Sequence, residues 1–513
     1  MSQATFDLRI LRTVSSLGLS LLAATIAGSA DAGEPPPAKV ASAFPYELAI
    51  SGLDRPVRVR FSVTVNGKPW LQNFNDIQRR YRQALFAQLD ADRDGKLSAE
   101  EARRLPPPRA WAAFPGGDDV HVAFNFRILD ADGDGTASAD EFERYALAFG
   151  EVPVRVATVP AGRASDDLFR ALDANRDRVL TAAEWSAAAN LLMKDRDANK
   201  VLSAEELRGP ASTVMPPEFV AAGPRNGTSR RSLEFEWKPA GDAPPDVEIS
   251  IDYPDAAAEP RRPVVGVRAA PQAGALVSKI AVHGGAPVLF VGGRRVVLRV
   301  PPAAVRSGAG LRQQLLNEFA AAAEQSAQEV TVAGLPPLLK SVFGIADRND
   351  DGRLEPAELE SYLDGLFVLE SAADAARLRL VKFNERTGLM PLVDLNLDGR
   401  LSRRELQALP EQLAAVAGKT GRITRDEIPP TVVLIVQRGP FVETTEGNVL
   451  ENAGPPWFFR ADRNQDGDLD REEFLGSPED FERVDQNGDG WIDLDEAILG
   501  DVVAPPAEAA GGK

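Results

Sequence analysis

The sequence predicts an α+β fold that is mainly helical. It consists of helix–loop–helix pairs, interspersed short β segments and a central antiparallel β sandwich or barrel. Two observations predict this fold: an acidic 12-residue pattern recurs on both sides of the chain's middle, and a β-rich stretch without that pattern lies between the recurrences. With 513 residues, 44% hydrophobic and 26% charged, the chain is long enough for two to four domains with separate cores.

The N-terminal residues 1–32 have the pattern of a signal peptide. Arg9 and Arg12 precede an apolar run over 14–27, and the small residues Ala30 and Ala32 suit a cleavage site. The run is shorter than a membrane span requires, so we expect cleavage, no membrane span afterwards, and a secreted or periplasmic location. A Pro-rich linker and a β hairpin are predicted over 33–75, the hairpin at 58–67.

The first acidic pattern, DADRDGKLSAEE, occupies residues 90–101. Positions 1, 3, 5, 7, 9 and 12 of such a loop direct oxygen atoms at one point, and Gly95 at position 6 supplies the positive φ of the sharp turn. Leu97 at position 8 is expected to point into a core. The pattern recurs in full at 130–141, 347–358, 394–405, 462–473 and 485–496, which is far more often than chance allows.

This spacing is that of a calcium loop, in which position 7 offers its backbone carbonyl and position 9 often holds a water. Calcium accepts this mixture of oxygens, whereas magnesium demands a tighter octahedron. The predicted metal ligands of the six full loops are Asp90, Asp92, Asp94, Lys96, Ser98, Glu101, Asp130, Asp132, Asp134, Thr136, Ser138, Glu141, Asp347, Asn349, Asp351, Arg353, Glu355, Glu358, Asp394, Asn396, Asp398, Arg400, Ser402, Glu405, Asp462, Asn464, Asp466, Asp468, Asp470, Glu473, Asp485, Asn487, Asp489, Trp491, Asp493 and Glu496.

Two degenerate loops keep most ligands but lack the glycine at position 6, where Arg178 and Lys200 stand. A non-glycine residue held left-handed costs roughly 1–2 kcal/mol, so these loops are weaker sites. Their candidate ligands are Asp173, Asn175, Asp177, Glu184, Asp195, Asp197, Asn199 and Glu206. A vestigial loop at 416–427 keeps Gly421, Ile423 and Glu427 but has no carboxylate at positions 1, 3 or 5. We expect it to bind no ion and to be a structural partner of its neighbour.

At these loops the chain resembles the EF-hand calcium-binding superfamily, as a secreted protein with compact, short-spaced hand pairs. The resemblance covers about half of the chain and implies that the loops of a pair touch each other at position 8. First positions lie 22 residues apart for Asp173 and Asp195, 22 for Asp394 and Val416, and 23 for Asp462 and Asp485. Each of these is predicted to be a compact EF-hand pair with a short middle helix.

The β segments complete the domain organisation. Short β-rich runs at 152–158, 378–383 and 431–437 each precede a compact pair, and 232–301 holds six more such runs. The predicted domains are four EF-hands at 76–210, two full and two degenerate; a β-rich domain at 211–305; EF-hands plus one vestigial hand at 306–430; a β segment with a compact pair at 431–500; and a disordered tail at 501–513.

The composition excludes several kinds of site. The chain has no cysteine and two histidines, which removes thiolate and histidine-rich metal sites, and its net charge of −18 argues against nucleic-acid binding. The eight ligand-bearing loops carry −23 and the other 417 residues +5, so the charge is concentrated in the loops. We expect about six Ca²⁺, up to eight.

The favoured function is calcium binding that stabilises a multi-module interaction scaffold, with no catalytic residue and no enzymatic activity. Two alternatives stay open. One is a calcium sensor that binds a partner, although only four methionines are available for an adaptable groove. The other is a hydrolase whose acid and base come from Glu234, Glu236, Asp246, Glu248 and Asp252 in the central β region. Whether the partner is a protein or a cell surface is also open.

Overall fold

The computed structural model describes residues 45–105, 125–149, 154–159, 167–208, 233–254, 262–274, 277–283, 286–303, 308–325, 331, 335–396, 398–439 and 455–503. The chain divides into two units, 1–39 and 40–513, and all described residues belong to the second. The predicted signal peptide, the linker up to residue 44 and the tail beyond residue 503 therefore lie outside the described residues. Helix α17 (Leu494–Val503) extends three residues into the predicted tail.

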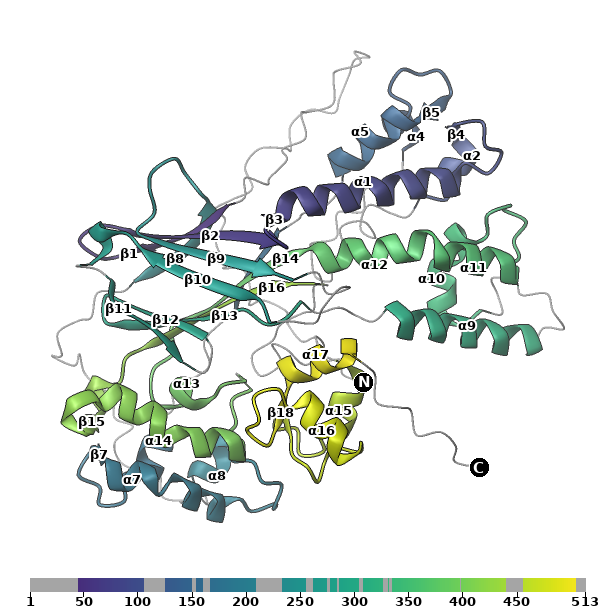
Figure 1. The fold of residues 1–513 in the computed structure, drawn as a ribbon. Coiled ribbons are helices and arrows are strands. Elements are labelled where there is room, and N and C mark those ends of the chain that lie inside the picture. Colours follow the sequence, from purple (N-terminus) through teal and green to yellow (C-terminus); the bar gives the residue numbers. More distant parts are fainter. Residues whose placement is uncertain are drawn as a thin grey trace, which may run out of the picture. The chain divides into compact units, whose positions relative to one another are not determined.

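The first six-stranded sheet has the order β10-β9-β2-β1-β8, with β3 paired to β2 (Figure 1). Its strands are β1 (Tyr46–Ser51), β2 (Val57–Val65), β3 (Lys68–Pro69), β8 (Glu234–Pro239), β9 (Val247–Tyr253) and β10 (Val264–Ala269). β2 alternates buried and half-exposed residues along its length, as expected of a strand with one face on a core. It turns into β3 at Asn66 and Gly67, whose φ values of 51° and 73° suit a tight hairpin.

The second six-stranded sheet has the order β11-β12-β13-β16-β14-β6. Its strands are β6 (Val154–Val159), β11 (Val277–His283), β12 (Ala286–Val291), β13 (Arg294–Arg299), β14 (Leu378–Phe383) and β16 (Thr431–Arg438). All eight residues of β16 are buried, as is typical of a strand covered on both faces. The three short β runs that precede hand pairs in the sequence are thus neighbouring strands of one sheet.

One hydrophobic core lies between the two sheets. It includes Ile50 and Phe61 of the first sheet and Leu380 and Leu434 of the second. Tyr253 is fully buried in this core and donates its hydroxyl to the carbonyl of Val436, 2.9 Å away. The sheets therefore form a two-layer β sandwich (Figure 1).

The predicted fold class is wrong in two respects. EF-hand pairs are not the dominant element, and the sandwich is not antiparallel: β2/β9, β13/β16 and β14/β6 are parallel pairs, and no closed barrel forms among the described strands. The predicted β stretch at 232–301 contributes three strands to each sheet. Strands from outside that stretch complete them: β2 and β1 lie between β9 and β8 in the first sheet, and β16, β14 and β6 continue the second sheet from β13.

The remaining elements belong to the acidic loops and their flanking helices. In the first part of the chain they are α1 (Trp70–Leu89), β4 (Lys96–Ser98), α2 (Ala99–Ala102), α4 (Phe126–Leu129), β5 (Thr136–Ser138), α5 (Ala139–Phe149), α6 (Asp167–Leu172), β7 (Val179–Thr181), α7 (Ala182–Ser186), the 3₁₀ helix η1 (Ala188–Lys194) and α8 (Ala204–Arg208).

After the 3₁₀ helix η3 (Pro271–Ala273), they are α9 (Gly308–Gln325), α10 (Pro337–Ala346), α11 (Pro356–Asp364), α12 (Leu366–Ala376), α13 (Met390–Val393), α14 (Arg403–Ala417), η5 (Gly418–Thr420), β15 (Arg422–Thr424), η6 (Arg425–Glu427), α15 (Pro456–Ala461), β17 (Asp468–Leu469), α16 (Pro478–Val484), β18 (Ile492–Asp493) and α17.

Three further cores hold these helices. The loops at 90, 130 and 347 share one core, in which Leu85 and Leu89 of α1 and Phe142 of α5 are buried. The loops at 173, 195, 394 and 416 share a second core, and the C-terminal loops at 462 and 485 have a third. Helices α1 and α12 join the first helical core to the sandwich, because each contributes residues to both cores. At their sandwich ends, the indole N–H of Trp70 donates to the carbonyl of Ala376 at 2.6 Å.

Candidate metal sites

All eight ligand-bearing loops close in the same way at position 1. One carboxylate oxygen of the aspartate accepts the backbone N–H of position 6 at 2.8 to 3.2 Å. The acceptor–donor pairs are Asp90/Gly95, Asp130/Gly135, Asp173/Arg178, Asp195/Lys200, Asp347/Gly352, Asp394/Gly399, Asp462/Gly467 and Asp485/Gly490. The six glycines have φ between 78° and 91°, and Arg178 and Lys200 both have φ 66°. The degenerate loops therefore keep the left-handed turn without glycine.

Position 12 performs a second, structural task that the ligand pattern does not reveal. In the first loop, Glu101 Oε2 accepts the backbone N–H of Ser98 at 2.8 Å while Oε1 accepts that of Ala91 at 2.8 Å. Ser98 and Glu101 form a capping box at the start of α2. The same box recurs at Ser402 with Glu405. The glutamate thus joins the two ends of the loop through backbone hydrogen bonds.

The loops have a second left-handed residue, at position 4, which the 12-residue ligand pattern does not specify. Arg93, Arg176, Ala198, Asp350 and Gln465 all have φ between 57° and 62° at this position. Only two loops, at 130 and 485, place glycine there. Most loops therefore have no glycine at position 4 that would mark the left-handed conformation there. For this reason the sequence does not predict it.

Among the residues that the structure describes, three loops bring three carboxylate oxygens within 4.8 Å of one another. These groups are Asp90, Asp92 and Asp94; Asp130, Asp132 and Glu141; and Asp195, Asp197 and Glu206. The third group belongs to a degenerate loop. Carboxylate oxygens this close repel one another unless a cation or proton lies among them, so the arrangement suits a divalent ion.

Buried ligand oxygens give an independent test of fit. Among the described residues, Asp347 Oδ1, Asp195 Oδ1 and Glu184 Oε1 are buried and accept no hydrogen bond. For both aspartates the other carboxylate oxygen is held by the N–H of position 6. Leaving a buried oxygen unsatisfied costs free energy, so these atoms fit a cation as their partner. Two of the three belong to the degenerate loops.

The loops meet in pairs at position 8. Leu97 is opposite Ala137 in β4/β5, and Leu469 is opposite Ile492 in β17/β18. The loop at 462–473 therefore pairs with its predicted neighbour at 485–496. Arg353, at position 7 of the loop at 347–358, forms a bridge with Thr331, which belongs to no predicted loop.

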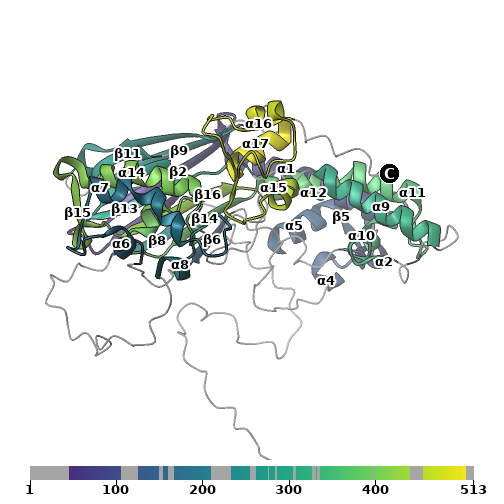
Figure 2. The same cartoon turned by 90° about the horizontal axis from the view of Figure 1, so that it is seen from below.

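The other two compact pairs were assigned the wrong partners. Leu180 lies opposite Ile423 in β7/β15, and Leu202 forms a bridge with Leu401. The loop at 173 therefore pairs with the vestigial loop at 416, and the loop at 195 with the loop at 394. Figures 1 and 2 both show α14 beside α7, and Figure 1 shows β15 beside β7. The vestigial loop is a structural partner, but of a loop in the first half of the chain rather than of its sequence neighbour.

The electrostatic environment differs between the loops. Around the first two loops, burial is outweighed by hydrogen bonds from Ser98 and Ser138, which lower the pKa of Glu101 and Glu141. In the C-terminal part, burial raises the pKa of Asp466 to about 8, and the nearby charge of Asp468 adds to the shift. Burial and the charge of Asp493 likewise raise the pKa of Glu496 to about 7.

Burial and the charge of Asp394 also raise the pKa of Glu405. At Asp466, Glu496 and Glu405, burial and a neighbouring carboxylate therefore disfavour the ionised form. A bound cation would favour it.

The five acids of the central β region either accept hydrogen bonds within the first sheet and its loops or are exposed. Asp246 is buried, and its two oxygens accept hydrogen bonds from Arg55 at 2.6 and 3.0 Å. Asp252 accepts hydrogen bonds from Thr64 and from the backbone of Gly67. Glu234, Glu236 and Glu248 are exposed. The two aspartates therefore support the sandwich.

None of the described helices combines the length and the apolar character needed to cross a membrane.

The sequence profile of the family described as EF hand matches residues 83–105, 126–147, 339–363, 457–475 and 479–496. These stretches contain five of the six full loops. The loop at 394–405 and the degenerate loops lie outside them. Neither a curated protein nor a solved structure matches the chain.

Proposed function

Since this chain contains EF hands of the calcium-binding superfamily, we propose that it holds about six Ca²⁺ ions, and up to eight, in its 12-residue loops. The ligands are those named for the six full loops, with the loops at 173 and 195 as weaker sites. The ions act mainly as structural stabilisers of a multi-module interaction scaffold. The chain performs no catalytic step.

The buried oxygens without a hydrogen-bond partner carry this proposal. Asp347 Oδ1 belongs to a full loop, and Asp195 Oδ1 and Glu184 Oε1 belong to degenerate ones. In each of these three carboxylates, a backbone N–H holds the second oxygen in place. The first oxygen is therefore fixed in position, buried and without a hydrogen-bond donor, which suits a metal ligand. This supports ion binding in the degenerate loops as well as in the full ones.

The crosswise pairing of loops supports a structural role. The hands at 173 and 195 follow strand β6, and the hands at 394 and 416 follow its parallel neighbour β14. Their loops then pair with each other through Leu180, Ile423, Leu202 and Leu401. An ion that binds only the folded loops stabilises the fold by mass action, and here it would do so across segments that are far apart in the sequence.

A secreted or periplasmic location remains part of the proposal and rests on the sequence of residues 1–32. Extracellular calcium is abundant, so site affinities of roughly 10⁻⁴ to 10⁻³ M would suffice for a structural role. A protein or cell-surface partner is proposed for the scaffold, without an assignment of its surface. No observation on the described residues favours the sensor or the hydrolase.

Native mass spectrometry tests the proposal by counting ions. Purified protein is stripped with a chelator, exchanged into volatile buffer and titrated with calcium. We expect six to eight bound ions and a gain of helical circular dichroism on loading. The variant Glu141→Gln should bind one ion fewer, while Glu143→Gln, just outside the loop, should bind the same number. A wild-type protein that retains no calcium would refute the function.

A further inference from the structure

The C-terminal loop pair at 462–496 meets positive side chains from other parts of the chain. Lys200 Nζ, from the degenerate loop at 195, lies 3.1 Å from Asp470 Oδ2 and 2.7 Å from Glu472 Oε2. An Arg262 nitrogen lies 3.9 Å from carboxylate oxygens of both Asp493 and Glu496. The third such side chain, Arg404, comes from position 11 of the loop at 394–405.

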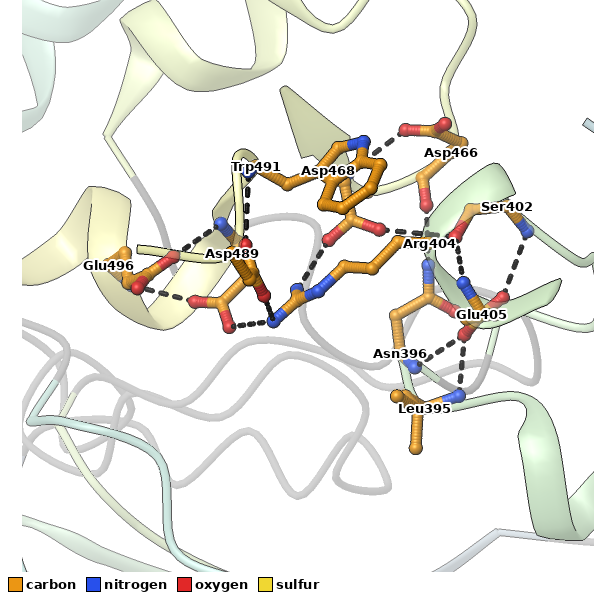
Figure 3. A network of polar contacts seen from close by, with 12 residues as sticks. Leu395, Asn396, Ser402, Arg404, Glu405, Asp466, Asp468, Asp489, Trp491 and Glu496 are labelled. Atoms are coloured by element: carbon orange, nitrogen blue, oxygen red, sulfur yellow. Dashed lines mark hydrogen bonds and ion pairs between the residues drawn. The ribbon is translucent and has the colours of Figure 1, made fainter. Parts of the chain in front are cut away.

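Arg404 makes the densest set of these contacts. Its Nη1 is 2.8 Å from Asp468 Oδ1, and its Nη2 is 2.9 Å from Asp489 Oδ2 and 3.2 Å from Asp493 Oδ2 (Figure 3). The side chain is 20% exposed. Burial opposes its charge, but the carboxylates of Asp468, Asp493 and Asp489 outweigh that effect and raise its pKa. Arg404 is therefore a fixed positive charge between two calcium loops.

Arg404 contacts the carboxylate oxygens of Asp489 and Asp493 that accept no backbone hydrogen bond within the loop at 485–496. Asp489 Oδ1 already accepts the backbone N–H of Trp491 at 3.0 Å, and Asp493 Oδ1 accepts that of Glu496 at 2.9 Å. Each carboxylate thus turns one oxygen to its own backbone and the other to Arg404. Positions 5 and 9, which these residues occupy, are ligand positions of the loop.

Two further hydrogen bonds join the two loops beside Arg404. Asn396 Nδ2 donates to the carbonyl of Asp466 at 2.7 Å, and the Ser402 hydroxyl donates to Asp468 Oδ2 at 3.1 Å. Gly467 lies so close to Asn396 that an added Cβ would come within 2.6 Å of the amide nitrogen. The contact between the two loops is therefore specific and close, and it does not depend on charge alone.

We infer that Arg404 competes with calcium for the loop at 485–496. An ion in this loop would draw on Asp489 and Asp493, which occupy ligand positions 5 and 9, and the guanidinium that now contacts both carboxylates would then lie beside a divalent cation. Coupling is reciprocal, so filling the loop weakens the contact between the hand at 394–405 and the C-terminal pair, and the contact lowers the ion affinity. This inference rests on the proposed calcium binding and adds a residue that tunes it.

Terbium luminescence can isolate this one loop. Tb³⁺ binds calcium loops, and Trp491 at position 7 lies next to the ion that its backbone carbonyl contacts. The signal of interest is the part of the tryptophan-sensitised emission that Trp491→Phe removes. Its dependence on terbium concentration gives the affinity of this loop in the full chain.

Three substitutions of Arg404 separate charge from packing. Arg404→Met and Arg404→Gln should each tighten terbium binding at this loop on the order of tenfold or more, because a positive charge is removed from beside the site. Arg404→Lys keeps the charge and should stay close to the wild type. The matched control is Arg403→Met, since Arg403 is the exposed neighbour of Arg404 in the same loop.

The outcomes distinguish the inference from the proposed function. If the wild type gives the Trp491-dependent signal but both neutral variants bind no more tightly, the competition is refuted while ion binding stands. If the wild type gives no such signal, this loop binds no ion and both statements fail for it. A circular dichroism spectrum equal to that of the wild type is required of each variant, and Arg404→Gln provides a second neutral side chain should Arg404→Met fail that criterion.

Discussion

At the scale of single residues, two loops have a non-glycine residue in the left-handed conformation at position 6, where the other ligand-bearing loops have glycine. Arg178 and Lys200 stand at position 6 with φ 66°. At Lys200 the ion pairs of the side-chain ammonium with Asp470 and Glu472 offset the backbone strain. Arg178 is exposed. The strain at Arg178 is therefore the clearer case for an experiment.

We predict that Arg178→Gly stabilises the calcium-free protein. Relief of the left-handed conformation gains roughly 1–2 kcal/mol, and the added freedom of glycine in the unfolded chain takes back about 0.5–1 kcal/mol. A net increase of about 0.5–1 kcal/mol in the free energy of unfolding is expected from urea titration. Ala174→Gly, at an exposed position of the same loop without positive φ, should give no gain.

Asp466 predicts an unusual pH dependence of the calcium-free protein. Its pKa in the fold is raised to about 8, mainly by burial and then by Asp468, against 3.8 for an ordinary aspartate. The folded state therefore binds the proton more tightly than the unfolded state. This contribution is fully favourable below about pH 4 and is lost as the pH rises towards 8.

In the presence of a chelator, the wild type should lose on the order of 2 kcal/mol more stability between pH 5 and 8 than Asp466→Asn. Thermal or urea unfolding at the two pH values measures this difference. Saturating calcium should reverse the wild-type trend, because the ion needs the ionised carboxylate. Equal pH slopes for the two proteins would show that Asp466 is not perturbed as described.

At the scale of elements, the loop at 173 pairs with the loop at 416, and the loop at 195 pairs with the loop at 394, instead of each pairing with its neighbour in sequence. Val179 at position 7 lies opposite Thr424 of the vestigial loop. A compact pair of sequence neighbours would instead place Val179 opposite position 9 of the next loop, Ser203. The two arrangements make different predictions for cross-linking.

A pair of introduced cysteines tests this pairing directly, because the chain has no cysteine of its own. Paired antiparallel residues have Cα atoms about 4.5–5.5 Å apart, which a disulfide can span. We expect Val179→Cys with Thr424→Cys to form a disulfide under mild oxidation. Val179→Cys with Ser203→Cys should not. Gel mobility with and without reductant, and peptide mapping of the bond, would read the result; the reverse pattern would restore the compact pairs.

At the scale of the whole molecule, the net charge of −18 originates in the calcium loops. Six ions would bring it to −6 and eight to −2. Without ions the loops repel themselves, which opposes the compact state. Calcium should therefore change the stability of the whole fold, including the sandwich that the hands are joined to.

At 10 mM calcium and a site Kd of about 10⁻⁴ M, each site that forms only in the folded protein adds about 2.7 kcal/mol to the free energy of unfolding. Urea titration of chelated and calcium-loaded protein should show at least this increase. Magnesium at the same concentration should give less, since it demands a tighter octahedron of ligands. A fold whose stability ignores calcium would contradict the structural role.

The sequence by itself determined the local conformation of each loop. The ligand spacing, the turn at position 6 and the apolar side chain at position 8 are local features, and the structure shows the same backbone closure in all eight loops. The capping role of position 12 and the left-handed residue at position 4 went unrecognised, although Ser98 and Glu101 have the residue types of a capping box.

Only the tertiary structure decided which loops and strands meet. Leu180, Leu202, Leu401 and Ile423 are apolar residues of similar size at equivalent positions, so any of them can pack against any other, and spacing along the chain favoured the nearest. The same holds for β6, β14 and β16, whose apolar runs predict strands but not their neighbours. Pairing depends on burial across the whole core, where contacts between segments far apart in the chain outweigh proximity in sequence.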